Sequence, residues 1–246
     1  MKLLVCISKT PDTTARIAFT DNDTRFDESG IQFIINPYDE WYALVRALEL
    51  KEQSGGELHI LTVGGADTEP IIRKALALGG DEAIRINAES TDGFFIASQI
   101  APVIREGGYD LVLTGKETID YNGSALGGMI AALSDLPYIS LATSLDVSEG
   151  TATLRRETEG GEEVCTVSLP AVVSCMKGMA EQRIPNMRGI MAARSKPLKV
   201  LEPVAADTLT TVVCYEQPAP KGAVKMIDPG NEEELVRLLH EEAKVI

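Results

Sequence analysis

Apolar residues in the first half of the chain follow two alternating patterns. Short uninterrupted apolar runs predict buried strands, and longer segments with apolar residues at i, i+3 and i+4 predict helices. We expect strands at 3–7, 58–63, 82–86 and 111–114, and helices from about 36, from about 68, over 94–105 and over 124–133. This alternation is typical of right-handed βαβ units. The fold class we predict is α/β, with a mostly parallel sheet and helices on both faces.

The start of the first helix is predicted from its composition. Asn36 is expected to cap it, Pro37 suits the first helical position, and Asp39 and Glu40 complement the positive end of the helix. Gly79-Gly80 ends the second helix.

The pattern changes after about residue 140, where the apolar runs become shorter and alternate with polar residues. Gly160-Gly161 separates two such runs and predicts a β-hairpin. A return strand at 170–175 is followed by 176–199, which has no clean periodicity. We expect two parts, an α/β domain over 1–200 and a proline-containing arm over 201–246. The arm closes in a helix opened by Asn231, with Glu234 completing a capping box.

Charge and composition exclude several classes of function. The formal charge of −14 disfavours binding to nucleic acid, which needs a basic surface. No apolar run is long enough to span a membrane, and the first apolar stretch is too short for a signal peptide, so we expect a cytoplasmic protein. Two histidines and four cysteines without C-x-x-C spacing offer little material for a metal site or a Ser–His–Asp triad. We expect no metal, no catalytic residues and reduced thiols.

The segment 111–129 carries the strongest candidate chemistry. A strand ends in Gly115, a polar loop follows, and small residues lead into a helix. Ligands of open α/β sheets bind at the carboxyl ends of strands, and helix N-termini attract phosphate. Glycines and Ser124 in this segment would let backbone amides approach a phosphate. Gly64-Gly65 and Asn36-Pro37 would form further walls of the same crevice. The alternative is an ordinary βα connection whose small-residue helix packs closely on the sheet.

Two common phosphate motifs are absent. Asp110 stands where a P-loop needs its first glycine, and Thr118 is two residues after Lys116 rather than adjacent. No G-x-G-x-x-G follows the first strand, so the dinucleotide fingerprint is missing as well.

Four segments together resemble the β subunit of electron-transfer flavoproteins. They are Asn36-Pro37-Tyr38-Asp39-Glu40, the run 73–81 (RKALALGGD), the run 115–120 (GKETID) and the run 169–173 (LPAVV). Their order and intervals match that family from residue 2 to about 200, and more loosely to the end.

The resemblance implies a fold of the adenine-nucleotide α-hydrolase-like group and a C-terminal arm that wraps an α subunit. It implies a heterodimer that carries electrons from dehydrogenases to a downstream acceptor through an FAD held mainly by the α subunit. It also implies a nucleotide on this chain. By position, that nucleotide would contact Cys6, Asn36, Val63, Gly115, Lys116, Glu117, Thr118, Ile119, Asp120, Tyr121, Asn122, Gly123, Ser124, Ala125 and Leu126.

The nucleotide is AMP in the non-bifurcating members of the family and a second FAD in the bifurcating ones. Lys116 matches the AMP type, whereas Thr10-Pro11-Asp12-Thr13 is closer to the other group. Of the AMP-type loop Asp-Asp-Asp-x-Asn-Gln-Thr-Gly, only Asp120 and Gly127 persist here. We expect AMP, with a second FAD as the alternative.

The resemblance also assigns surface roles. Glu181, Arg183 and Met187 fall in the segment that docks dehydrogenases, with Met187 at the anchor position unless it packs internally, and Thr13 and Tyr38 would lie near the flavin of the α subunit.

Two rival classes share the fold group. The first is a universal-stress-type nucleotide sensor, and the long arm beyond residue 200 argues against it. The second is an ATP-pyrophosphatase, which needs a Ser-Gly-Gly-x-Asp loop after the first strand. Here that segment is Ser8-Lys9-Thr10-Pro11-Asp12, which lacks both glycines.

Overall fold

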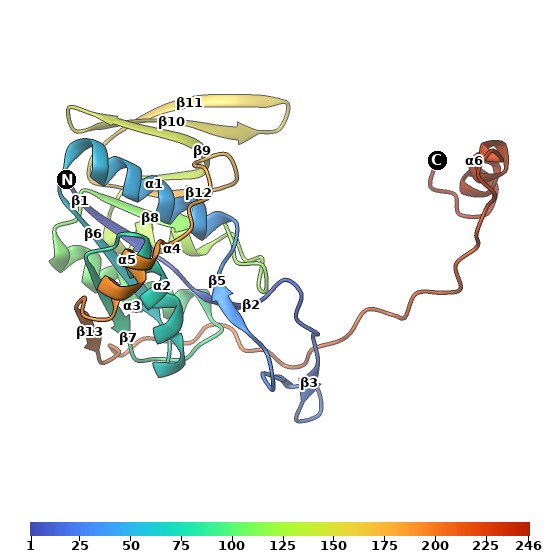
Figure 1. Cartoon of the computed structure of the whole chain (residues 1–246), viewed down its shortest axis with the longest axis horizontal. Coiled ribbons are helices and arrows are strands. Elements are labelled where there is room, and N and C mark those ends of the chain that lie inside the picture. Colours follow the sequence, from blue (N-terminus) through green and yellow to red (C-terminus); the bar gives the residue numbers. More distant parts are fainter.

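A computed structural model describes residues 1–246, and its centre is a nine-stranded sheet between two layers of helices (Figure 1). The strand order is β11-β10-β9-β12-β8-β1-β6-β7-β13, and every neighbouring pair from β9 to β13 is parallel. The central strands are apolar because helices cover both of their faces. They are β1 (Lys2–Cys6), β6 (Glu57–Val63), β7 (Glu82–Ile86), β8 (Leu111–Gly115) and β12 (Ala171–Cys175). The predicted fold class is confirmed.

Alternate residues of β1 point into two separate cores, as the pleat of a strand requires. Leu3 and Val5 pack with α1 (Asp39–Ser54) and α2 (Glu69–Leu78). A short 3-10 helix, η1 (Ala66–Thr68), directly precedes α2. Leu4 packs on the opposite face with α3 (Gly93–Gly107) and α4 (Leu126–Ser134). Both layers were predicted.

The order of the strands creates a switch point beside β1. The chain runs from β1 to β6 and β7 on one side, then returns to place β8 and β12 on the other side. Loops that leave the carboxyl ends of β1 and β8 therefore diverge, which opens the crevice where α/β folds bind ligands.

The predicted hairpin is present and extends the main sheet at one edge. It comprises β10 (Thr151–Thr158) and β11 (Gly161–Ser168), and β9 (Tyr138–Ser148) joins it to β12.

Two helix starts differ from prediction. The first helix begins at Asp39, with Tyr38 at the N-cap position and no side-chain cap. Asn36 is buried and its amide group is used elsewhere, by the loop after β8. The helix predicted from Ser124 begins at Leu126, because Ser124 has a positive φ of 47° that no right-handed helix accepts.

Two elements in the segment without periodicity were not predicted. They are α5 (Met187–Ala193), capped by Asn186 through the backbone N–H of Gly189, and β13 (Leu198–Leu201), which pairs with β7. Both are short, at seven and four residues, so neither repeats its apolar pattern often enough to be recognised.

Between β1 and α1 the chain forms two small ladders that project from the body (Figure 1). One pairs β2 (Lys9–Pro11) with β5 (Phe33–Ile35), and the other pairs β3 (Phe19–Thr20) with β4 (Arg25–Phe26).

The C-terminal arm leaves the body after β13 and carries α6 (Glu232–Glu241) far from the sheet (Figure 1). The predicted capping box is wrong: the Asn231 side chain accepts no bond from the helix, and its amide instead donates to the Glu234 carboxylate at 3.3 Å. The backbone of Asn231 (φ −113°, ψ 50°) lies outside the extended conformation that a cap requires. No helix is long and apolar enough to cross a membrane.

Candidate nucleotide crevice and aromatic cavity

The switch-point crevice collects several of the predicted contact residues. Cys6, Val63 and Gly115 are the last residues of β1, β6 and β8, three strands that are neighbours in the sheet. Because the strands are parallel, all three residues lie along the same edge. Burial raises the pKa of the Cys6 thiol, so Cys6 is a neutral, apolar floor there.

Asn36 binds the loop that follows β8. Its Nδ2 donates to the carbonyl oxygen of Glu117 at 2.8 Å, and its Oδ1 accepts from the backbone N–H of Ile119 at 3.2 Å. This reciprocal pair holds the first part of the loop against the start of α1. The structure therefore brings Asn36 together with loop residues that are also predicted to contact the nucleotide.

The rest of the loop is an exposed turn. Residues 120–125 are exposed, and Asn122 and Ser124 both have positive φ values. The Ser124 hydroxyl donates to Glu117 at 2.6 Å, and Lys116 pairs with the same carboxylate at 2.8 Å. Lys116 and Ser124 are thus engaged with a neighbouring acid in the free chain.

The N-terminus of α4 faces this loop without a side-chain cap. The first backbone N–H groups of a helix have no partner inside it, and together with the helix dipole they favour an anion. Gly127 in the first turn also has a packing role: a Cβ there would lie 2.9 Å from both the Thr114 hydroxyl and the Tyr138 hydroxyl. The close packing named as the alternative to a phosphate loop is therefore present.

Two carboxyl groups are buried beneath the loop, at the start of α1. Glu40 accepts from the backbone N–H and the hydroxyl of Ser8, both at 2.7 Å, and burial raises its pKa to about 8. Burial also raises the pKa of Asp39. Gly115 passes directly over them, since a Cβ at that position would lie 2.8 Å from the Cγ of Glu40. The glycine is needed for this close approach.

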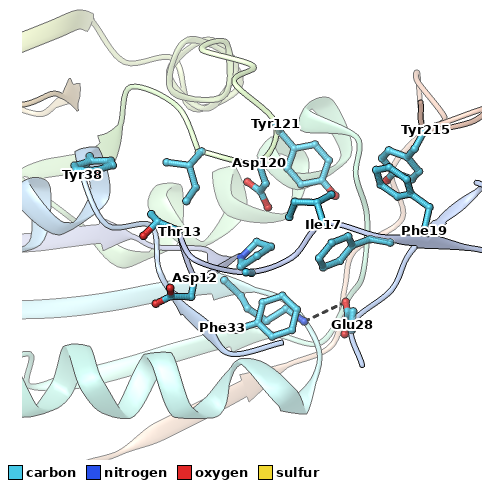
Figure 2. Close-up of a pocket in the computed structure, with 15 residues that line it drawn as sticks. Asp12, Thr13, Ile17, Phe19, Glu28, Phe33, Tyr38, Asp120, Tyr121 and Tyr215 are labelled. Atoms are coloured by element: carbon cyan, nitrogen blue, oxygen red, sulfur yellow. Dashed lines mark ion pairs between the residues drawn. The ribbon is translucent and has the colours of Figure 1, made fainter. Parts of the chain in front are cut away.

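Beside the crevice lies a cavity of about 600 Å³ with aromatic walls (Figure 2). Thr13 and Tyr38, both predicted to lie near a flavin, line it, as do Ile119, Asp120 and Tyr121 of the loop. Six of the twelve aromatic side chains of the protein gather here: Phe19, Phe26, Phe33, Tyr38, Tyr121 and Tyr215. Such a wall suits a planar ring system, because rings stack on rings.

Most of this aromatic wall was missed by sequence reasoning. Phe19 stacks on Tyr215 of the C-terminal arm with the ring centroids 4.7 Å apart and the planes 5° from parallel. Lys9 lies over the ring of Phe33, 4.0 Å from its centroid. The sequence signal that could have revealed this wall was the density of aromatic residues in 19–38. No signal pointed to Tyr215, because it lies nearly 200 positions from Phe19 in the chain.

The predicted docking residues lie on and before α5, which packs on α2. The Met187 side chain is 73% exposed, so it does not pack internally. Ile184, at 85% exposed, comes three residues before it in the chain, and Ile190 and Met191 of α5 are exposed as well. Arg183 forms a bidentate pair with Glu52 at 2.7 and 2.9 Å, whereas Glu181 is exposed.

The four cysteines are free, as predicted, but they are not all buried. Cys6 and Cys175 are buried, Cys165 is half-buried and Cys214 is exposed on the arm.

The fold and the crevice define a doubly wound α/β protein of the kind that binds ligands at a switch point. A family model described as "Electron transfer flavoprotein domain" matches residues 23–206. The chain belongs to the electron transfer flavoprotein family, among its β subunits.

Individual relatives agree. The chain is 35% identical to "Electron transfer flavoprotein subunit beta" of Bacillus subtilis over 261 aligned residues, which cover 100% of both chains. It is 35% identical to the protein of the same name from Syntrophomonas wolfei, over 91% of this chain and 88% of the relative. It is 30% identical to "Protein FixA" of Azotobacter vinelandii, over 93% and 84%. The predicted family is confirmed, and the chain is an electron transfer flavoprotein subunit.

Proposed function

We propose that this chain is the small subunit of a heterodimer that passes electrons from dehydrogenases to a downstream acceptor through an FAD on the larger subunit. The observation that carries this proposal is the unpartnered arm. The apolar side chains of Leu235 and Val236 on α6 are exposed, as are those of Val213 and Met226 before it. An apolar, extended segment without a covering surface is typical of a protein–protein contact.

The two parts of the chain have separate roles in this proposal. Residues 1–200 form the nucleotide domain, to which the structure adds Leu201 as the end of β13, and the remainder to residue 246 forms the arm that contacts the α subunit.

The aromatic cavity supplies the chain's contribution to the flavin site. A bound FAD supplies the redox chemistry. Thr13 and Tyr38 would lie beside its ring system, and the apolar walls would keep water away from it. Four charged side chains of this chain line the cavity and would set the charge around that ring: Lys9, Asp12, Glu28 and Asp120. The chain would have no catalytic residue of its own.

AMP is the nucleotide we propose for the crevice. The support is the Asn36 clamp on the loop, the uncapped N-terminus of α4 and the glycine at 115. AMP would be held by the neutral floor at Cys6 and by backbone groups of the loop. It would have a structural role.

A second candidate for the crevice is FAD, and one observation favours it. The cavity continues directly from Ile119, Asp120 and Tyr121, so a dinucleotide whose adenylate half lay in the crevice could extend its ring toward the aromatic wall. Heat release of the ligand from the purified heterodimer, followed by chromatography, separates the two. One AMP per FAD supports the first candidate, and two FAD without AMP supports the second.

Electron transfer itself is tested with the purified heterodimer and a panel of flavin dehydrogenases from the source organism, each supplied with its substrate. We expect at least one to bleach the absorbance of the heterodimer's flavin within a stopped-flow trace, and a downstream acceptor to restore it. If no dehydrogenase reduces the flavin of an intact complex, the proposed carrier function is contradicted.

A further inference from the structure

Asp92 binds the C-terminal arm with a carboxyl group that also caps a helix. Its side chain is 1% exposed at the N-cap of α3, where Oδ1 accepts from the backbone N–H of Phe95 at 2.9 Å. Oδ2 accepts three bonds from the arm: the N–H groups of Leu209 at 2.6 Å and Thr210 at 2.5 Å, and the Thr210 hydroxyl at 3.1 Å. The two oxygens of one carboxylate therefore serve two different segments.

A second polar pair lies two turns further along the same helix. Gln99 donates from Nε2 to the carbonyl oxygen of Val204 at 3.0 Å, and its Oε1 accepts from the N–H of Val204 at 2.7 Å. Gln99 is buried, so both of its polar atoms depend on the arm for these bonds. Residues seven apart share one face of a helix, and that face binds the first part of the arm.

The arm then reaches the aromatic cavity. The N–H of Tyr215 donates to the carbonyl oxygen of Asp23 at 2.7 Å, its ring stacks on Phe19, and Gln217 donates to the carbonyl oxygen of Ile17 at 3.0 Å. Beyond Gln217 no hydrogen bond or ion pair joins the arm to the body. The arm thus has a seated proximal part, 202–217, and a free distal part.

We propose that Asp92 is a positioning residue: by clamping Leu209 and Thr210 it seats Tyr215 as a wall of the aromatic cavity and so couples the arm to retention of a planar ring there. The identity of that ring, the flavin of the larger subunit, rests on the proposed function. The coupling itself rests on the contacts of this chain.

The length of the tether gives the expected size of the effect. Tyr215 lies only five positions after Thr210, so the clamp confines its backbone to within about 17 Å of the anchor. Without it the last anchor is Val204, eleven residues away. Effective concentration falls with roughly the 3/2 power of tether length, so seating of Tyr215 should weaken roughly threefold.

Asp92→Ser separates the two roles of the carboxyl group. Serine retains the helix cap but has no second oxygen for the arm. In hydrogen exchange on the full chain, we expect the amides of Leu209 and Thr210 to lose protection and that of Tyr215 to exchange roughly threefold faster. Asp110→Ser is the matched control, because Asp110 accepts from the N–H of Lys2 at 2.7 Å away from the arm. Unchanged protection at Leu209 and Thr210 would overturn the clamp.

The flavin readout uses the purified heterodimer and the rate of FAD release, followed by its fluorescence. We expect Asp92→Ser to speed release by up to roughly threefold and Tyr215→Ala to speed it at least as much. Tyr215→Phe should keep the wild-type rate, and the double variant Asp92→Ser/Tyr215→Ala should release FAD no faster than Tyr215→Ala alone. If Asp92→Ser frees the arm amides but leaves both Tyr215 protection and FAD release unchanged, the coupling is wrong. A complex that holds no flavin contradicts the proposed function, and the exchange rate of Tyr215 still decides the positioning role.

Discussion

Glu40 is the side chain that we expect to contribute most to the pH dependence of the free energy of unfolding near neutrality. It is buried, and burial raises its pKa from 4.5 to about 8. Between these two values the folded chain binds more protons than the unfolded chain, so stability falls as pH rises. Below the unfolded pKa the penalty is absent. The pKa of Asp39 is raised as well, so Asp39 changes stability in the same direction. The pKa of Asp92 is lowered to about 2, so the stability that its carboxylate contributes is present at neutral pH and is lost only in acid.

Glu40→Gln should therefore flatten the dependence of stability on pH. In the wild type we expect the free energy of unfolding to fall by about 1 kcal/mol per pH unit between pH 5 and pH 8, and in the variant this slope should largely disappear. Urea denaturation of the full chain at four pH values measures it. Glu57→Gln, at an exposed position, is the control. Parallel curves for wild type and Glu40→Gln would show that Glu40 carries no such penalty.

Gly115→Ala tests the close approach of β8 to α1. The added Cβ would lie 2.8 Å from the Cγ of Glu40 and 3.1 Å from the Cβ of Asp39. Relieving this overlap requires the start of α1 to move, and we expect a loss of about 1–3 kcal/mol in the free energy of unfolding. Gly123→Ala is the matched control in the same loop, since nothing lies within 4 Å of its added Cβ. Equal stability of the two variants in urea would contradict the packing described.

For single residues, the sequence allowed a role to be predicted where that role depends on neighbours close in the chain. The glycine that ends β8 and the apolar residues of β1 follow from local pattern. Asn36 resembled a helix cap, yet its amide group binds a loop 81 residues away. Tyr215 joins the cavity through a stack on Phe19. Long-range pairs of this kind leave no periodic signal in the chain.

Among the secondary-structure elements, helix α5 is the one that we expect to dock a dehydrogenase. Met187→Glu places a charge on its most exposed apolar side chain, and we expect at least tenfold slower electron transfer from a dehydrogenase with no loss of the heterodimer, because a charge cannot enter an apolar pocket cheaply. Stopped-flow reduction of the flavin measures it. Val164→Glu, which alters an exposed apolar residue on β11 at the opposite edge of the sheet, is the control. Unchanged kinetics for Met187→Glu would remove the docking role.

Elements were predictable from the sequence where they were long and periodic. The central strands and helices α1 to α4 were foreseen, and their boundaries shifted only where a cap or a positive φ intervened. In contrast, β13 has four residues and exists because β7 offers a parallel partner, Leu198 opposite Ala83 to Leu201 opposite Ile86. Such an edge strand depends on tertiary pairing rather than on its own pattern.

The molecule as a whole consists of a body with a seated proximal arm and a free distal arm. The succession of strands and helices was enough to predict the body, and the prolines after residue 200 predicted an arm. The path of its proximal half was not predictable, because it depends on Asp92 and Gln99 of α3.

A chain truncated after Gln217 separates these two parts. Since the distal arm makes no hydrogen bond or ion pair with the body, we expect the truncated chain to keep the thermal unfolding midpoint of the full chain but to bind the larger subunit at least tenfold more weakly. Calorimetry and a titration of the two subunits measure these quantities. Full affinity for the larger subunit after truncation would contradict the role of the arm.

Native mass spectrometry of the chain co-expressed with the larger subunit tests directly whether this protein is one half of a flavin-carrying heterodimer. We expect one copy of each subunit with a bound FAD and a bound AMP, in a complex that is yellow in solution. A chain that remains alone or pairs only with itself, with no flavin in any complex, would contradict it.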